Sequence, residues 1–248
     1  MANQQPTYPL DRRILEIIME LTGTTLEVNL DQGKKATAKT YNDISSQVAD
    51  GAWEMKLRNN ENAKRPTEYE PLHQNTWKRI FGHARSDGSI MDEGKTISDS
   101  TLKQIALFLG YKEWEDFETE IDEVYQRVVI EHGLVYENMG AEDVYSTLME
   151  RCGYDDLKAG DELEVHWPKS RGYDLNGDAF IKISYLGCAR FRVNAVQNCS
   201  LKHGDEFEVL CIKEGERVYL ANLIRNRRPI GSYTGGYKVT SIKKYPKQ

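Results

Sequence analysis

The sequence predicts an α+β protein with a helical N-terminal half and a C-terminal half of short antiparallel strands that close into a small β-barrel. Three observations predict it. Apolar residues recur at helical spacing up to about residue 110, and β-branched and aromatic residues alternate with polar ones in the C-terminal half. A nine-residue pattern in that half also occurs twice. We divide the chain into a helical domain at 1–117, an acidic helical connector at 118–152 and a barrel domain at 153–248.

The composition is that of a folded, water-soluble protein. Of the 248 residues, 39% are hydrophobic and 29% are charged, which excludes a disordered or fibrous class. No stretch approaches the roughly 18 to 20 consecutive apolar residues of a membrane span, and residues 1–10 lack the pattern of a signal peptide. We therefore expect a cytoplasmic protein without membrane contact. Its cysteines, which form no C-x-x-C pair, are expected to be reduced core thiols: Cys152, Cys188, Cys199 and Cys211.

Helix signals are clearest at the two ends of the helical half. Apolar residues at helical spacing fill 11–21, and Gly23 suits a left-handed C-terminal cap. Ser98 is a good N-cap for a helix that carries one apolar stripe and ends at Gly110. The sequence therefore predicts a helix at each of these places.

Two further helices are predicted between them. Thr40 is the expected cap of a helix in which Ile44 and Val48 share one face. Polar residues 58–70 predict a loop or insertion, and 75–81 predicts a short helix closed by a glycine.

The C-terminal half shows the alternation of strands. In 189–196 the side chains of Phe191, Val193 and Ala195 are expected to face one way. Asn176-Gly177 predicts a tight hairpin turn, because both positions of such a turn need positive φ.

An internal repeat strengthens the prediction of a barrel. The run LKAGDELEV at 157–165 recurs 44 residues later as LKHGDEFEV at 201–209. In each copy a turn containing glycine precedes a strand with two inward apolar residues. We infer two similarly built hairpins within one small barrel rather than a solenoid.

The charge of the chain is distributed unevenly. Residues 1–112 carry 15 basic and 15 acidic side chains, 113–156 carry 2 and 14, and 157–248 carry 16 and 10. The net charge of −6 therefore arises in the middle segment, and both flanking parts are free to carry basic patches.

The order of the helical segments 41–48, 74–81 and 98–110 resembles the helix-turn-helix core of the lambda-repressor-like (XRE-type) regulators. The resemblance covers roughly 40–117, under a third of the chain. More narrowly, the chain is similar to an uncharacterised bacterial family that joins such a domain to a small C-terminal β-barrel. The resemblance implies a transcriptional regulator that binds double-stranded DNA, with the barrel serving regulation or oligomerisation.

One departure from that pattern leaves two interpretations open. A helix-turn-helix joins its helices by about three or four residues, whereas some 25 residues separate segment 41–48 from segment 74–81 here. Either 49–72 is an insertion, with its own helix around 53–57, or the second helix of the motif lies within that stretch.

The candidate DNA contacts lie in a stretch without acidic residues, from Leu72 to Ser86. Trp77 and Ile80 are expected to pack inward, which leaves polar and basic side chains outside. Amide side chains suit adenine and cations suit guanine or phosphate. The candidates are Gln74, Asn75, Lys78, Arg79, His83 and Arg85.

A second basic cluster lies in 225–248, which contains no carboxylate. Its cations and tyrosines predict a site for single-stranded nucleic acid or RNA, although an edge strand with a solvated basic face is the commoner origin of such a cluster. The candidates are Arg225, Arg227, Arg228, Lys243 and Lys244.

No enzyme motif is found, so we predict no catalytic residue and no cofactor. Asp174, Asn176 and Asp178 imitate the start of a calcium loop, but Ala179 and Tyr185 occupy its sixth and twelfth positions, so no metal is predicted. A non-enzymatic adaptor that binds a protein partner or a second copy of the chain is the main alternative to DNA binding.

Overall fold

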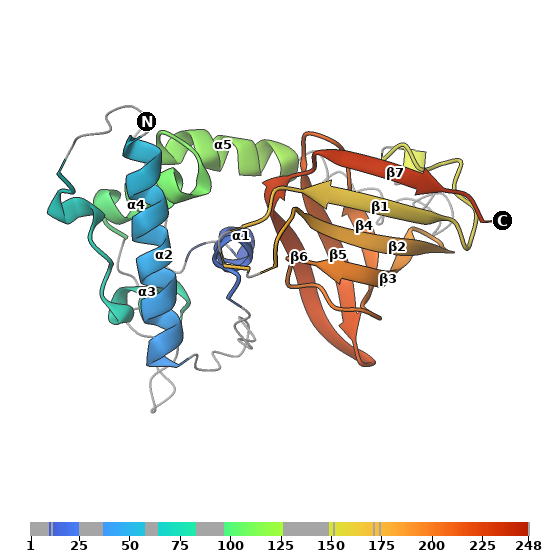
Figure 1. The fold of residues 1–248 in the computed structure, drawn as a ribbon, viewed down its shortest axis with the longest axis horizontal. Coiled ribbons are helices and arrows are strands. Elements are labelled where there is room, and N and C mark those ends of the chain that lie inside the picture. Colours follow the sequence, from blue (N-terminus) through green and yellow to red (C-terminus); the bar gives the residue numbers. More distant parts are fainter. Residues whose placement is uncertain are drawn as a thin grey trace. The chain divides into compact units, whose positions relative to one another are not determined.

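A computed structural model describes residues 10, 12–24, 37–57, 64–82, 97–125, 149–150, 152–170, 172–173 and 175–247. The chain divides into two compact units, 1–120 and 121–248 (Figure 1), and each is described by itself. The helices are α1 (Arg12–Thr22), α2 (Ala38–Leu57), the 3-10 helix η1 (Thr67–Tyr69), α3 (Gln74–Ile80), α4 (Asp99–Leu109) and α5 (Trp114–Tyr125). The boundary that the sequence predicted at 117/118 falls within α5, and residues 126–148 of the predicted connector lie outside the described residues.

The outer two predicted helices of the first unit begin and end where the sequence indicated. Gly23, with φ 62°, follows α1, and the amide of Thr24 reaches back to the carbonyl of Met19. The hydroxyl of Ser98 accepts a hydrogen bond from the amide of Thr101, and Gly110 ends α4 in the left-handed conformation. Local capping chemistry therefore sets these boundaries.

Helix α2 is longer than the sequence indicated. Its cap is Thr37, whose hydroxyl accepts from the amide of Thr40, so the prediction of Thr40 as the cap is wrong by one turn. Ile44 and Val48 are fully buried on one face, as predicted. Residues 53–57 continue α2 and do not form a separate helix.

The segment that precedes α3 is held by side chains of α2 and α4. Ser45 donates to the carbonyl of Leu72 over 2.5 Å. The amide of Gln104, a residue that is 2% exposed, donates to the carbonyls of Glu68 and Glu70 over 3.4 and 3.1 Å. Buried side-chain donors thus satisfy carbonyls in and after η1, which orders the approach to α3.

The second unit contains a seven-stranded antiparallel sheet in the order β6-β5-β4-β3-β2-β1-β7 among the described residues (Figure 1). The sheet is open, so the predicted closed barrel is wrong. β6 and β7 are consecutive in the chain but lie at opposite edges, and the amide of Ile242 in β7 donates to the Glu214 carboxylate instead of a β6 carbonyl. The strands are β1 (Glu162–Trp167), β2 (Ala179–Gly187), β3 (Arg190–Gln197), β4 (Glu206–Cys211), β5 (Arg217–Arg225), β6 (Arg228–Lys238) and β7 (Ser241–Tyr245).

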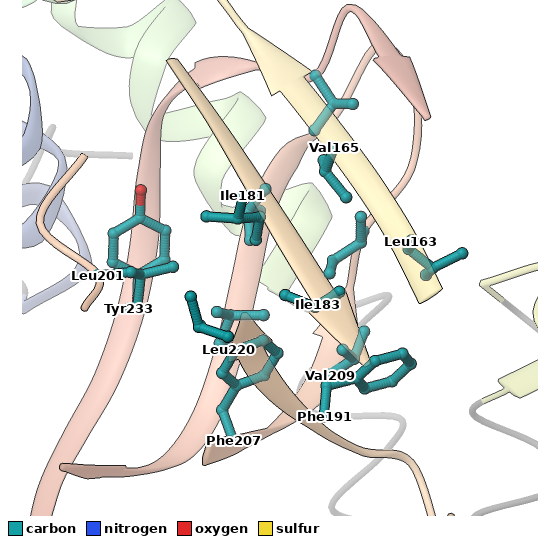
Figure 2. Close-up of a cluster of buried hydrophobic side chains, with 14 of the residues drawn as sticks. Leu163, Val165, Ile181, Ile183, Phe191, Leu201, Phe207, Val209, Leu220 and Tyr233 are labelled. Atoms are coloured by element: carbon teal, nitrogen blue, oxygen red, sulfur yellow. The ribbon is translucent and has the colours of Figure 1, made fainter. Parts of the chain in front are cut away.

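One face of this sheet carries the core of the second unit. In β1 and β4 every second residue is buried, which is the period of a strand with one covered face. Figure 2 shows side chains from neighbouring strands meeting there. They include Leu163, Val165, Ile181, Ile183, Phe191, Phe207, Val209, Leu220 and Tyr233.

The first copy of the repeat forms a hydrogen-bonded turn before β1. Gly160 has φ 100°, and its amide donates to the carbonyl of Tyr185. The amide of Tyr185 donates back to the carbonyl of Asp161. The Asp161 carboxylate accepts from the amides of Lys158 and Lys247, over 2.9 and 2.8 Å, and these bonds lower its pKa.

The second copy before β4 reproduces this pattern. Gly204 has φ 83°, its amide donates to the carbonyl of Val193, and the amide of Val193 donates to the carbonyl of Asp205. The Asp205 carboxylate accepts from the amide of Lys202 over 2.8 Å. The two copies differ in one partner of the aspartate. Asp205 binds the Arg225 guanidinium, whereas Asp161 binds a backbone amide at that place. The repeat is therefore a duplicated turn, and its aspartates are structural.

Three local predictions for the second unit need correction. Asn176-Gly177 lies in the long connection 168–178, and only its glycine has positive φ; the two-residue turns are Cys188-Ala189 and Asn226-Arg227. A register shift within β3 pairs Ala195 with Lys182, so Ala195 does not share the buried face of Phe191. The four cysteines form no disulfide, but Cys188 is exposed and Cys152 is half-buried, so only two are core thiols.

Candidate nucleic-acid interface

Helix α3 is amphipathic in the sense that the sequence predicted. Trp77 is 0% exposed and Ile80 is 1% exposed, which confirms their inward packing. Phe81, just after the helix, lies 6.0 Å from the ring of Tyr41 and 6.2 Å from that of Trp77. The His73 Nδ1 atom caps the helix by accepting from the amide of Asn75. One side of α3 is thus anchored on aromatic rings.

The structure separates the four predicted contacts that lie on α3. Asn75 is exposed, whereas Gln74, Lys78 and Arg79 are half-buried. The Lys78 ammonium lies 6.0 Å from the centre of the Tyr41 ring, a distance at which the ring face attracts a cation. The amide oxygen of Gln74 and the Nε atom of Arg79 are enclosed by protein. Asn75 and Lys78 are therefore the better placed of the four to meet a ligand.

The remaining two candidates on this stretch, His83 and Arg85, lie outside the described residues. The described part of the acid-free stretch runs from Leu72 to Gly82. Its cations, Lys78 and Arg79, fall in the last turn of α3, where they also complement the negative end of the helix dipole.

The helix pair with the spacing of a helix-turn-helix is α4 and α5. Four residues, from Gly110 to Glu113, join them, and Gly110 has φ 96°. This pair was not predicted from the sequence, because the expected motif ended with the helix at 98–110. α5 contains six carboxylates and no cation, so its field repels phosphate. Among the described helices of this unit, α3 is the one with more cations than carboxylates.

The predicted C-terminal basic cluster is two separate features. Lys243 and Lys244 lie on β7, an edge strand, as the alternative interpretation of that segment predicted. The Lys243 ammonium is 3.5 Å from the Glu164 carboxylate, and that of Lys244 is 2.9 Å from Asp156. Both charges are thus matched by carboxylates at the sheet edge.

The three arginines of that cluster lie at the β5–β6 hairpin. Arg225 is bound by the buried Asp205 carboxylate, over 2.6 Å, which raises the pKa of the guanidinium. Arg227 and Arg228 are exposed, and among the described residues their side chains make no hydrogen bond or ion pair. Only these two arginines of the cluster are available to a partner.

The outer face of the sheet is covered by matched charges. The Glu162 and Lys182 side chains meet at 2.7 Å, which lowers the pKa of the carboxyl and raises that of the ammonium. Glu164 accepts from His166 at 2.7 Å, and this bond lowers the pKa of Glu164. Such cross-strand pairs stabilise the sheet. They leave this face without the excess of cations that a single strand of nucleic acid requires.

No helix among the described residues has the length and apolar character needed to cross a bilayer, and they contain no cluster of three or more metal-binding side chains. A scan against protein-family models found no match, and searches of characterised proteins and of solved structures found no similar protein. The similarity to the lambda-repressor-like regulators stays a prediction from the residues quoted above.

Proposed function

We propose that the protein is a DNA-binding transcriptional regulator in which α3 contacts duplex DNA. The observation that carries the proposal is the burial of Trp77 and Ile80, which directs Asn75 and Lys78 away from the core. No carboxylate lies between Leu72 and Gly82, so phosphate meets no repulsion from the helix itself.

The two residues have different roles in this proposal. The amide of Asn75 has the donor and acceptor that match the edge of adenine in the major groove. The ammonium of Lys78 neutralises a phosphate and adds affinity on any sequence. The sheet unit serves regulation or oligomerisation, and the protein works as a dimer if its DNA site is symmetric.

Fluorescence anisotropy with labelled genomic duplexes over a range of salt concentrations tests this function. Lys78→Gln should weaken binding to all duplexes and reduce the slope of log K against log salt by about 0.9, the value for one phosphate contact. Asn75→Ala should lower discrimination between sites by about 1–3 kcal/mol. Lys103→Gln is the matched control, since this exposed lysine of α4 lies 3.9 Å from Glu113. An affinity that changes neither with salt nor with Lys78→Gln contradicts the proposal.

The α4–α5 pair supports a second candidate function, that of a protein-binding adaptor. The ring of Phe117 lies 5.4 Å from that of Trp114 on the same helix and 5.1 Å from that of Tyr111, which holds α5 against the preceding loop. The acidic side chains Glu115 and Asp116 are exposed beside them. A basic protein surface is the complementary partner. This function is favoured over DNA binding if the native protein copurifies with one stoichiometric protein partner and without nucleic acid. The double variant Glu115→Lys with Asp116→Lys should then lose that partner.

A further inference from the structure

The tip of the β5–β6 hairpin carries arginine where stability favours glycine. Asn226 and Arg227 form its two-residue turn with φ 50° and 63°, and Arg225 and Arg228 are paired across it. Turns of this kind prefer Asn-Gly, because a side chain at the second position crowds the backbone. A sparsely populated backbone conformation of this kind indicates a functional role for the side chain.

A buried ion pair anchors this tip to a neighbouring turn. The Arg225 guanidinium donates to Asp205 over 2.8 and 2.6 Å and to the carbonyl of Ser200 over 3.1 Å. The amide of Lys202 donates to the same Asp205 carboxylate, so the turn that holds Lys202 and His203 lies beside the hairpin. This ion pair thus brings the loop at 202–203 close to the hairpin that ends at 227–228. We call the surface that they form the basic ridge, and it consists of the exposed side chains of Lys202, His203, Arg227 and Arg228.

The acidic groups next to the basic ridge are already neutralised. Asp205 is 0% exposed and bound to Arg225, and Glu206 is bound by Arg190 and Arg192. The sequence contains no carboxylate after Glu216. The basic ridge therefore has an excess of positive charge, in contrast to the outer face of the sheet.

We propose that the basic ridge is a second DNA contact and that Arg227 enters the minor groove of a duplex. This inference rests on the proposed DNA-binding function and adds a site in the sheet unit. The minor groove is about 6 Å wide, too narrow for a helix but accessible to an arginine on a hairpin tip. Ile230, which is 40% exposed and two residues beyond Arg228, supplies an apolar contact of the kind that minor-groove proteins use.

The composition of the basic ridge favours a duplex over a single strand. Recognition of single strands depends on aromatic rings on which bases stack. Among the described residues of the sheet unit, the exposed tyrosines are Tyr237 and Tyr245, which lie near the end of β6 and on β7 and not at the tip. A duplex with a narrow minor groove, as in A-tracts, has the enhanced negative potential that attracts arginine.

The test uses the full-length protein and labelled duplexes that contain either an A-tract or a G·C-rich centre. Arg227→Gly removes one guanidinium and leaves the turn with its preferred residue, so loss of binding does not reflect unfolding. The slope of log K against log salt should fall by about 0.9 in Arg227→Gly and by about 1.8 in Arg227→Ala with Arg228→Ala. The preference for the A-tract should fall in both variants. Netropsin bound to the A-tract should weaken DNA binding by the native protein and leave DNA binding by the double variant unchanged.

The control is Lys158→Ala with Lys213→Ala, two exposed lysines of the same unit outside the basic ridge. If the native protein binds no duplex, the proposed function fails. If Lys78→Gln reduces the salt slope but the variants of the basic ridge behave like the control, this inference alone is overturned. The minor-groove assignment is also overturned if those variants lose binding to single-stranded DNA or poly-glutamate to the same extent as binding to the duplex. It is likewise overturned if their loss of binding is insensitive to netropsin.

Discussion

Replacement of Asp205 by alanine removes a fully buried carboxylate from the sheet unit. The carboxylate accepts three hydrogen bonds, two from Arg225 and one from the amide of Lys202. Its removal leaves a guanidinium that is only 27% exposed without its anion. Breaking a buried ion pair costs about 3–5 kcal/mol, and the partial exposure of Arg225 places the loss near 3 kcal/mol. Asp205→Asn keeps an acceptor for Lys202, so we expect a loss of about 1–2 kcal/mol.

Native-state hydrogen exchange followed by mass spectrometry measures this loss in the intact chain. The amides of β4 and β5 should open more easily by the stated free energy, while those of α4, in the other unit, serve as an internal reference. Glu208→Ala is the matched control on β4, because this carboxylate accepts from Asn222 at the surface and should change stability by less than about 0.5 kcal/mol. A loss below about 1 kcal/mol for Asp205→Ala would show that the Asp205–Arg225 pair does not stabilise the sheet unit.

Three further perturbations test the fold. Gly204→Ala should destabilise the sheet unit by about 1–2 kcal/mol, because its φ of 83° is unfavourable for alanine and no atom lies within 4 Å to crowd the new methyl group; urea unfolding measures it, and a gain in stability would contradict the duplicated turn. Gln104→Ala should cost about 1–2 kcal/mol and speed amide exchange in 67–72, since two carbonyls lose their donor; unchanged exchange would show that other contacts hold this segment. Burial raises the pKa of Tyr154, whose hydroxyl lies 2.6 Å from the carbonyl of Ile212, so the native state keeps a proton that the unfolded chain loses above pH of about 10. Stability should therefore be intact below that pH and fall as pH rises beyond it, and unfolding midpoints of Tyr154→Phe should show a smaller alkaline loss than those of the native protein.

Local chemistry explains which parts of the fold the sequence predicted. The caps at Ser98, Gly23 and Gly110 act within a few residues, so their residue types suffice to place helix boundaries. The burial of Trp77 and Ile80 follows from helical spacing in the same way. The repeat predicted a duplicated turn, although its hydrogen bonds to β2 and β3 required the coordinates.

The wrong predictions concern features that depend on distant residues. The Cys188-Ala189 and Asn226-Arg227 turns could not be predicted from an Asn-Gly signal, because they lack it. The strands around them impose positive φ on other residues. Closure of a barrel requires two edge strands to pair, and Ile242 finds a carboxylate on another loop instead. Alternation alone does not reveal the register shift that turns Ala195 away from the core.

The candidate sites show the same division between features that nearby residues determine and features that depend on distant residues. The sequence identified Lys78 and Arg227 as cations in acid-free segments, and the structure adds which neighbours are neutralised. It could not show that Lys243 and Lys244 meet carboxylates, because Glu164 and Asp156 lie 79 and 88 residues earlier in the chain. Nor could it bring Lys202 and His203 beside Arg227, which requires the pairing of Arg225 with Asp205.

Contact of α3 with duplex DNA is best tested by the salt dependence of binding by the intact protein, with and without Lys78→Gln. We expect the native protein to bind duplex DNA with an affinity that falls steeply with salt, and Lys78→Gln to bind more weakly with a slope reduced by about 0.9. Equal affinities and equal slopes for the native protein, Lys78→Gln and Lys103→Gln would contradict contact of α3 with DNA.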